Sequence, residues 1–274
     1  MNQKERLDYL VNFLCEDSDQ YKKLQFAENE KRNALRSLMN IRMPKYISSE
    51  FLQIQDDFLK QELLESGIVS WKEIPHIGEQ FGIQYEHAQK VALWQGDITK
   101  LKVDAIVNAA NSQMLGCFAP CHKCIDNAIH SAAGVELREE CNSYMKAKKK
   151  EDPYYEEPTG RAVLTKGYNL SCRYVLHTVG PIVKGALTES LKQDLRDCYR
   201  SCFQEAMSHG IRTIAFCCIS TGEFHFPNEE AVKIAWTTIK EILNQHADRL
   251  DRVVINVFKK LDLELYQELL SKEA

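Results

Sequence analysis

The chain has 274 residues, of which 44% are hydrophobic and 27% are charged, and its formal net charge is −4. This composition is typical of a globular protein and excludes a disordered chain, while the length fits one domain with an extension. The small negative charge provides no broad cationic field, so it disfavours a nucleic acid held mainly through its phosphates.

The amino terminus, MNQKERLDYLVNF, is charged from its first residues and contains no long apolar run. It predicts neither a secretory signal nor a membrane span, so we expect a cytoplasmic protein without a membrane partner. The chain contains ten cysteines. In a reducing compartment, clustered thiols are more often metal ligands or catalytic groups than disulfides.

Residues 1–90 are expected to form a helical N-terminal extension. Apolar residues at helical spacing form three stripes within it, and glycine and proline then interrupt the pattern between residues 67 and 82. The stripes are Leu7, Leu10, Val11 and Leu14; Leu35, Leu38 and Met39; and Phe51, Ile54 and Phe58.

From residue 91 to residue 274, short β-rich runs alternate with amphipathic stretches. This alternation predicts an α/β domain, a three-layer α/β/α sandwich with a mixed central sheet, in which residues 162–178 form an antiparallel hairpin. The expected strands are residues 91–95, 105–108, 162–167, 174–178, 213–219 and 253–258. The expected helices are residues 126–147, interrupted near Gly134, and residues 187–209, 228–244 and 263–271.

Four polar stretches follow expected strands, and sheets of this class bind ligands beyond the carboxyl ends of their strands. One of them, ISTGEF (219–224), offers two hydroxyls and a glycine just before an expected helix. This combination is typical of phosphate binding through backbone amides, although it also suits an ordinary strand-to-helix turn. The other three are WQGDIT (94–99), NAAN (108–111) and VFKKLD (257–262).

Single residues in these stretches have two interpretations each. Asp97 would accept a hydrogen bond from an adenine amino group or form its own turn. Asn108 and Asn111 would bond ribose hydroxyls or close their own turn. Phe258 would stack on a base, although an aromatic residue that ends a buried strand more often belongs to the core.

Together the stretches resemble the macrodomain family, whose members are ADP-ribose-binding α/β/α modules. The resemblance covers residues 91–271 and rests, in the family's order, on QGDIT, DAIVNAAN, a loop leading to DNAIHSAAG, GRA, YVLHTVGP and ISTGEF. It implies that Asp97 and Ile98 hold the adenine, with Phe258 as a weaker adenine neighbour. The ribose nearest the attachment point is assigned to Asn108 and Asn111. The diphosphate is assigned to Ser220, Thr221, Gly222, Glu223 and Phe224.

The loop after NAAN departs from this resemblance. Hydrolytic relatives of the MacroD type carry a run of glycines there, whereas this chain keeps Gly116 and then places three cysteines and a histidine within eight residues. Two thiolates and an imidazole can close on a tetrahedral Zn²⁺ and leave the fourth position open to water or substrate. The alternatives are a ligand set that includes Cys121, a closed four-ligand structural site, and unligated thiols.

The loop is similar to that of the zinc-dependent macrodomains of bacteria and fungi, which also carry a helical N-terminal extension. This resemblance implies Cys117, His122 and Cys124 as ligands of a Zn²⁺ cofactor. It also implies a glycosidase-type hydrolase that releases mono-ADP-ribose from acidic side chains of modified proteins. His130, inside the following helix, is expected to be packed rather than a ligand.

Asp126 occupies the position of the aspartate that follows the glycine run in relatives of the MacroD type. We expect it, with Asn111, to be catalytic. It would position or deprotonate a water molecule, or else cap the helix that begins there. Asn111 would hold the ribose hydroxyls. A metal beside that ribose would orient it or lower the pKa of a bound water to about 7.

Two other functions use the same residues. One is a reader that binds ADP-ribose without chemistry, and the other is a hydrolase of small derivatives such as O-acetyl-ADP-ribose. The resemblance also suggests a lipoyl-carrier protein as the modified substrate and a sirtuin-like transferase as its modifier. The chain is expected to be a monomer. Its N-terminal extension would contact the modified target or cover the edge of the sheet, and we expect the second, structural role.

Overall fold

The structure is a computed structural model that describes residues 1–273. It divides into two compact units, each built from separate stretches of the chain. Unit 1 comprises residues 1–68, 114–155 and 168–170, and unit 2 comprises residues 69–113, 156–167 and the described chain from residue 171 onward. The division at residue 90, which follows the change of sequence pattern, stays a prediction.

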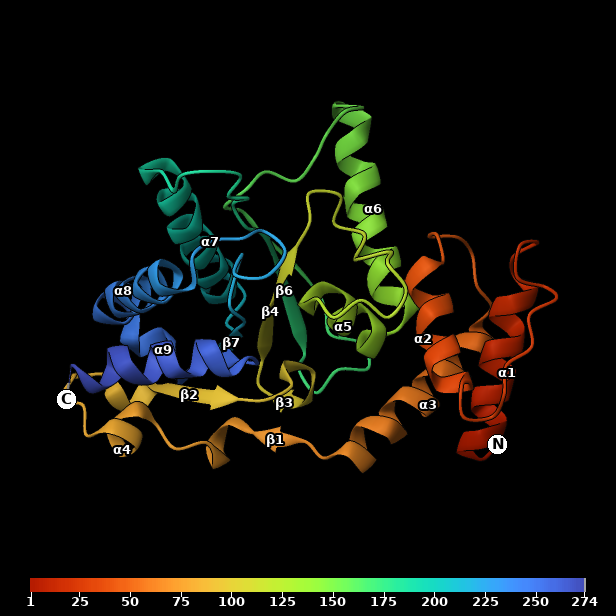
Figure 1. Cartoon of the computed structure of the whole chain (residues 1–274), viewed down its shortest axis with the longest axis horizontal. Helices are drawn as coiled ribbons and strands as arrows, with labels where there is room; N and C mark the ends of the chain where they lie inside the picture. Colours follow the sequence, from red (N-terminus) through yellow and green to blue (C-terminus); the bar gives the residue numbers. More distant parts are fainter. Residues whose placement is uncertain (274) are drawn as a thin grey trace. The chain divides into compact units, whose positions relative to one another are not determined.

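Unit 1 is helical, as the red, orange and yellow-green ribbons of Figure 1 show. Its helices are α1 (Gln3–Glu16), α2 (Lys31–Ile41), α3 (Ser49–Ser66), α5 (Ile125–Ala133) and α6 (Val135–Glu151). The break between α5 and α6 confirms the predicted interruption. Gly134 takes a φ of 98°, and a Cβ there would lie 2.6 Å from Gln55 Nε2, so this position requires glycine.

The predicted apolar stripes form the core where α1, α2 and α3 meet. Leu10, Leu35 and Phe51 are almost completely buried there, and burying each such side chain stabilises the fold by roughly 1.5–3 kcal/mol. Asn2 closes the start of α1 with both bonds of a capping box, and the Ser48 hydroxyl caps α3. The helical N-terminal part that the periodicity predicts is therefore confirmed.

Unit 2 contains a six-stranded sheet in the order β2-β8-β7-β4-β6-β5. Neighbouring strands are parallel except β5 and β6, which form the predicted antiparallel pair. The mixed sheet is thus confirmed. The strands are β2 (Val91–Gln95), β4 (Ala105–Ala110), β5 (Ala162–Lys166), β6 (Tyr174–Val179), β7 (Thr213–Phe216) and β8 (Arg252–Val257). A separate parallel pair joins β1 (Val69–Ser70) to β3 (Leu101–Lys102).

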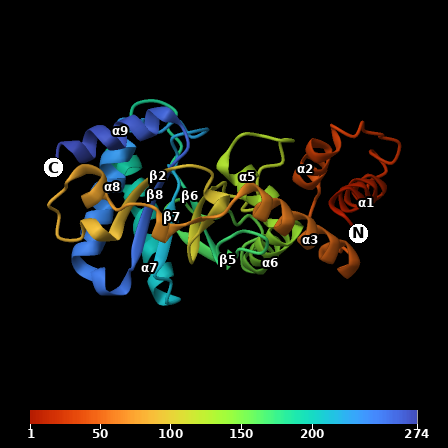
Figure 2. The ribbon, with the colours of Figure 1, turned by 90° about the horizontal axis from the view of Figure 1, so that it is seen from below.

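The helices of unit 2 group along this sheet in Figures 1 and 2. Helix α7 packs on β5 and β6 and against α8, and α9 packs against α8 and β8. The helices are α4 (Ile77–Phe81), α7 (Glu189–Ser208), α8 (Asn228–His246) and α9 (Lys260–Ser271). None of the helices in the described part of the chain has the length and hydropathy that crossing a bilayer requires.

Several predicted bounds differ from the structure by one to four residues, and two of these differences bear on the site. Strand β7 ends at Phe216 rather than at residue 219, because residues 217–218 leave the ladder and the chain then turns at Ser220. Helix α9 begins at Lys260 rather than at residue 263. Both differences lie beside the stretches predicted to bind the ligand.

Candidate functional site

The stretches predicted to bind a ligand lie at or directly after the carboxyl ends of β2, β4, β7 and β8 of unit 2. Each of these strands is parallel to its neighbours in the order β2-β8-β7-β4, so their carboxyl ends share one edge of the sheet. In open α/β sheets, ligands bind at such an edge. The topology therefore brings together the stretches that the sequence singled out.

Ser220 is the most unusual residue at this edge. It takes a φ of 64° and is 5% exposed, and its hydroxyl has no hydrogen-bond partner among the residues that the structure describes. Gly180 provides the space, because a Cβ there would lie 2.0 Å from Ser220 Oγ. A buried polar group left unpaired costs about 1–3 kcal/mol, and a hydrogen bond from a bound ligand or water molecule would remove that cost.

The rest of ISTGEF forms a turn that is partly exposed to solvent. Thr221 Oγ1 donates to the carbonyl of Cys218 at 3.2 Å, and the N–H of Val183 donates to the carbonyl of Phe224 at 2.9 Å. Gly222 and Glu223 are exposed. The turn thus leaves the main chain at Gly222 and Glu223 exposed just before α8, which suits the predicted diphosphate role.

The residues predicted to hold adenine have three different environments. Asp97 Oδ1 accepts from the N–H of Thr99 at 3.0 Å and from its hydroxyl at 2.7 Å, so the turn-forming interpretation is confirmed. The side chain of Ile98 is 1% exposed and belongs to the core. Phe258 is 76% exposed directly after β8, so the alternative in which it belongs to the core is wrong. Its exposed ring suits the stacking role.

The two asparagines predicted to hold ribose also differ. Strand β4 pairs with β6 as far as Ala110, so Asn108 does not end the strand as predicted but lies buried inside it. Its Nδ2 is 3.0 Å from His177 Nδ1. Burial lowers the pKa of His177 to about 3, so this ring is neutral. Asn111 is half-buried just after the strand, and its Oδ1 accepts from the N–H of Gln113 at 3.0 Å, which closes a turn.

In unit 1 the cysteine loop brings the three predicted metal ligands together. The ligand atoms of Cys117, His122 and Cys124 lie within 4.8 Å of one another. Tetrahedral Zn²⁺ with bonds of about 2.0–2.3 Å places its ligand atoms roughly 3.3–3.8 Å apart, so a small contraction closes the set. The alternative ligand set is not formed, because Cys121 Sγ instead lies 3.2 Å from Ser37 Oγ.

The electrostatics of this cluster fit a divalent cation. Burial, with Cys117 and Asp126 nearby, raises the pKa of Cys124 to about 12, even though its Sγ accepts the Asn127 N–H at the start of α5. Burial also lowers the pKa of a nearby cation, Arg138, to about 10. Two thiols and a carboxyl thus share one poorly solvated environment. A metal would offset the repulsion between their charged forms.

Asp126 lies in the first turn of α5 and is 5% exposed. Cys124 occupies the N-cap position, so the alternative in which Asp126 caps the helix is wrong. Asp126 Oδ1 is 3.5 Å from Nε2 of His130, one turn further along. His130 is buried and packs against Gly116, where a Cβ would lie 2.8 Å from the ring. The prediction that His130 is packed is confirmed.

Comparison with known proteins identifies the family of this chain. A model of the Macro domain family matches residues 107–235. A protein named Protein-ADP-ribose hydrolase from Treponema medium is 44% identical over 274 residues, which cover 99% of this chain and 100% of that protein. The chain belongs to the macrodomain family. A second Protein-ADP-ribose hydrolase, from Staphylococcus aureus (strain COL), is 38% identical to this macrodomain and covers 99% of it and 97% of its own length.

Solved structures agree with this assignment. The crystal structure of the Trypanosoma brucei macrodomain in complex with ADP-ribose superimposes with a TM-score of 0.66 at 30% identity. It covers 86% of this chain and 94% of the other. The fold is therefore the macrodomain α/β fold, a mixed sheet flanked by helices, with an additional helical N-terminal part.

Sequence reasoning missed the element that holds the cysteine loop of this macrodomain. Helix α2 carries a polar row with spacing i, i+3, i+4 and i+7, which a helix places on one face. The members of the row are Asn33, Arg36, Ser37 and Asn40. The spacing was readable, but polar rows on helices are usually solvated, and only the structure shows that this one meets the loop.

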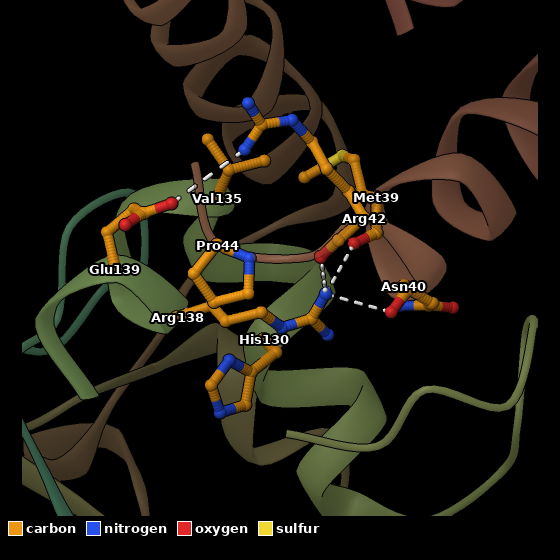
Figure 3. A pocket seen from close by; sticks show the side chains of 9 residues that line it. Met39, Asn40, Arg42, Pro44, His130, Val135, Arg138 and Glu139 are labelled. Carbon is orange, nitrogen blue, oxygen red and sulfur yellow. Dashed lines mark hydrogen bonds and ion pairs between the residues drawn. The ribbon is translucent and has the colours of Figure 1, made fainter. Parts of the chain in front are cut away.

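Sequence reasoning also missed Arg138 of α6, which is buried. Figure 3 shows its guanidinium facing the end of α2, where Nη1 donates to the carbonyls of Met39, Asn40 and Arg42 at 2.8–2.9 Å. Its Nε donates at 2.7 Å to the carbonyl of Leu115, at the start of the cysteine loop. The adjoining cavity measures about 10 Å³, enough for one water molecule at most.

Proposed function

We propose that this macrodomain is a zinc-dependent hydrolase that releases mono-ADP-ribose from acidic side chains of modified proteins. The observation that carries the proposal is the convergence of Cys117, His122 and Cys124. It occurs in a chain whose full-length relatives are named protein-ADP-ribose hydrolases. Residues 107–235, which match the family, include both the cysteine loop and ISTGEF.

The ligand would be bound by the sheet edge of unit 2. The buried Ser220 hydroxyl and the partly exposed turn after it would receive the diphosphate, because a ligand oxygen would complete the missing hydrogen bond. The exposed ring of Phe258 would stack on the adenine. Asn111, half-buried just after β4, would bond the ribose hydroxyls.

The three converging side chains would hold the metal in unit 1. Zn²⁺ bound by two thiolates and an imidazole provides Lewis acidity and lowers the pKa of bound water. Asp126, buried one turn before His130 and beside these ligands, would orient the attacking water and accept its proton. Water oxygen bonds to the anomeric carbon as the bond to the side-chain carboxylate oxygen breaks.

The chemistry of the leaving group supports an acidic side chain as the attachment point. A departing carboxylate has a pKa near 4, so it leaves as an anion without a proton from a general acid. One carboxylate that acts as a base therefore suffices, and Asp126 is the buried carboxylate beside the cysteine cluster.

Elemental analysis combined with a release assay tests the proposal. We expect about one zinc per chain, release of ADP-ribose from a glutamate-linked substrate, loss of release on chelation, and recovery when zinc is returned. Cys117→Ala should lose zinc and release together, while Cys121→Ser, whose thiol lies outside the cluster, keeps both.

Two outcomes would contradict the proposal. Full release by a metal-free Cys117→Ala protein would remove the role of the metal. Stoichiometric binding of ADP-ribose without any release would instead identify a reader. A parallel assay with O-acetyl-ADP-ribose separates protein substrates from small derivatives.

The resemblance to zinc-dependent macrodomains also suggests a specific protein substrate and location. We propose an ADP-ribosylated lipoyl-carrier protein, modified by a sirtuin-like transferase, in the cytoplasm. Release from that carrier should show a higher kcat/KM than release from an unrelated protein with the same linkage. Equal values would leave the carrier without a special role.

A further inference from the structure

We propose that α2 sets the number of sulfur ligands in the metal centre. Its polar row of Asn33, Arg36, Ser37 and Asn40 keeps Cys121 away from the cluster. The proposal rests on the proposed function only in taking the cluster as a Zn²⁺ site. It assigns the N-terminal helical part a direct role in shaping that site.

Cys121 is held by three residues of α2. Its N–H donates to Asn40 Oδ1 at 3.0 Å, and its Sγ lies 3.2 Å from Ser37 Oγ and 3.5 Å from the carbonyl oxygen of Asn33. The residue takes a φ of 51°, a left-handed backbone conformation that residues other than glycine rarely adopt. Such a conformation persists only where the surroundings determine it, and here α2 provides those surroundings.

Asn40 is itself fixed in place. It is 1% exposed, and its Nδ2 donates to the hydroxyl of Ser131 in α5 at 2.9 Å. Its carbonyl receives one of the bonds from Arg138. Both ends of the residue are therefore restrained, so the acceptor that holds Cys121 cannot turn away without breaking buried hydrogen bonds.

Arg36 restrains the other side of the loop. Its Nη2 donates to Asn127 Oδ1 at 2.7 Å and to the carbonyl of His122 at 3.1 Å, and its Nε donates to Asn127 Oδ1 at 3.1 Å. Asn127 in turn donates through Nδ2 to the carbonyl of Ala119 at 2.9 Å, and its main-chain N–H contacts Cys124 Sγ at 3.4 Å. One arginine thus positions two of the three ligands.

The consequence concerns the fourth coordination position. Zn²⁺ takes four ligands, and a site with four protein ligands is structural, whereas a site with three keeps a position for water or substrate. Cys121 directly precedes the ligand His122, so a released loop would supply a third thiolate. By holding Cys121, α2 keeps that position open.

Sulfur counting tests the inference. X-ray absorption at the zinc edge on the full-length zinc-loaded protein should report two sulfur ligands in wild type and three in Asn40→Ala. The double variant Asn40→Ala/Cys121→Ser should return to two. Arg36→Lys keeps the positive charge but loses the planar guanidinium that donates several hydrogen bonds at once. For this variant, chelator competition should show zinc affinity lowered about 10- to 100-fold.

A matched arginine on the same helix is the control. Arg32 bonds Glu62 of α3 at 2.6 Å rather than the loop, so Arg32→Ala should leave the sulfur count and the zinc affinity unchanged. The thermal midpoint of the chelated proteins shows whether each variant folds. If Asn40→Ala does not fold, Ser37→Ala provides the same sulfur-count test.

Three sulfurs in wild type would overturn the inference, as would two sulfurs in a folded Asn40→Ala protein with wild-type zinc affinity. Those results would not contradict the proposed hydrolase activity. A wild-type protein that binds no zinc would overturn both, and the two failures are therefore distinguishable.

Discussion

Ser220 combines a left-handed backbone with a buried hydroxyl that has no partner among the described residues, so its role is testable by removing one atom. We expect Ser220→Ala to leave the free energy of unfolding unchanged or about 1 kcal/mol higher, because an unpaired buried hydroxyl destabilises. Affinity for ADP-ribose should fall about tenfold, the effect of one lost hydrogen bond. Calorimetric titration and urea unfolding measure the two quantities.

Ser201 of α7 is the matched control, since its hydroxyl donates to the carbonyl of Cys198 at 3.1 Å. Ser201→Ala should show the opposite pattern, a slightly lower free energy of unfolding with unchanged ADP-ribose affinity. Unchanged affinity in Ser220→Ala would show that its hydroxyl does not contact the ligand.

Asp126 gives the second prediction at this scale. Because Cys124 caps α5, Asp126→Asn should keep the helix and the fold, with the thermal midpoint within a few degrees of wild type. The rate of ADP-ribose release should fall about 10²- to 10⁴-fold, the usual effect of losing a general base, while ADP-ribose affinity is kept. Single-turnover release and titration measure these quantities.

Asp152, exposed at the end of α6, supplies the control, and Asp152→Asn should release ADP-ribose at the wild-type rate. An Asp126→Asn protein that releases at the wild-type rate would exclude the carboxylate from the chemistry.

Individual site residues were predictable where chemistry and spacing agree. Two cysteines and a histidine on one loop predicted a set of metal ligands, and the structure brings the three side chains together. The exposure of Phe258 was not predictable, because whether an aromatic residue after a strand is covered depends on elements distant in sequence. The same holds for the position of Asn108 inside β4, which the pairing with β6 decides.

At the scale of elements, local patterns located most helices and strands. Strand β2 has its predicted bounds, and α5 and α6 separate at the glycine that the pattern indicated. Strand β7 is shorter than its apolar run, because its end depends on the register with β4 and β8. The polar row of α2 was missed for a related reason, since its partners lie more than eighty residues further along the chain.

The contact between α3 and α6 predicts a pH dependence. Burial, followed by the nearby Asp56 carboxylate, raises the pKa of Glu136 to about 7, although Gln55 Nε2 donates to it at 3.3 Å and Lys60 lies nearby. Between about pH 4.5 and pH 7 the folded chain therefore keeps a proton that the unfolded chain has released. The contribution of Glu136 to the free energy of unfolding is therefore highest below this window and falls as the pH rises through it.

Glu136→Gln should remove this pH-dependent fall in the free energy of unfolding. Because the side chain is only half-buried, we expect a gain over wild type of about 1 kcal/mol at pH 8 and almost none at pH 4.5. Urea unfolding at both pH values measures the difference. In Glu151→Gln, at the exposed end of α6, any change should be the same at both values. Equal gains at both values in Glu136→Gln would rule out the shifted pKa.

For the whole molecule, the interleaving of the two units was not predictable. The sequence pattern suggests an extension followed by a domain, whereas residues 114–155 associate with residues 1–68 in one compact unit. Periodicity reports which face of an element is buried but not which distant element covers it. Buried polar partners such as Arg138 leave no local pattern at all.

The division predicts a selective effect of the metal. The three proposed zinc ligands all belong to unit 1, so chelation should lower the thermal transition of unit 1 and leave that of unit 2 in place. The expected loss is about 4 kcal/mol when free zinc was at 1,000 times its dissociation constant. Scanning calorimetry with and without chelator measures it.

Two core variants identify the transitions. Phe51→Ala leaves a cavity in the α1–α3 core, and Phe203→Ala leaves one where α7 packs. Each should lower the free energy of unfolding of its own unit by about 3–5 kcal/mol. Equal shifts of both transitions on chelation would show that the metal stabilises the molecule as a whole.

The discontinuity of unit 1 has a consequence for any attempt to isolate the catalytic part. A shortened chain that starts at residue 91 would retain the proposed zinc ligands and every residue proposed to bind ADP-ribose. It would lack the three carbonyls at the end of α2 that accept from Arg138 Nη1, and so would leave the guanidinium with its bond to Leu115 but without those three acceptors beside the cysteine loop. Trimming the first helices away would therefore damage the centre that the truncation was meant to expose.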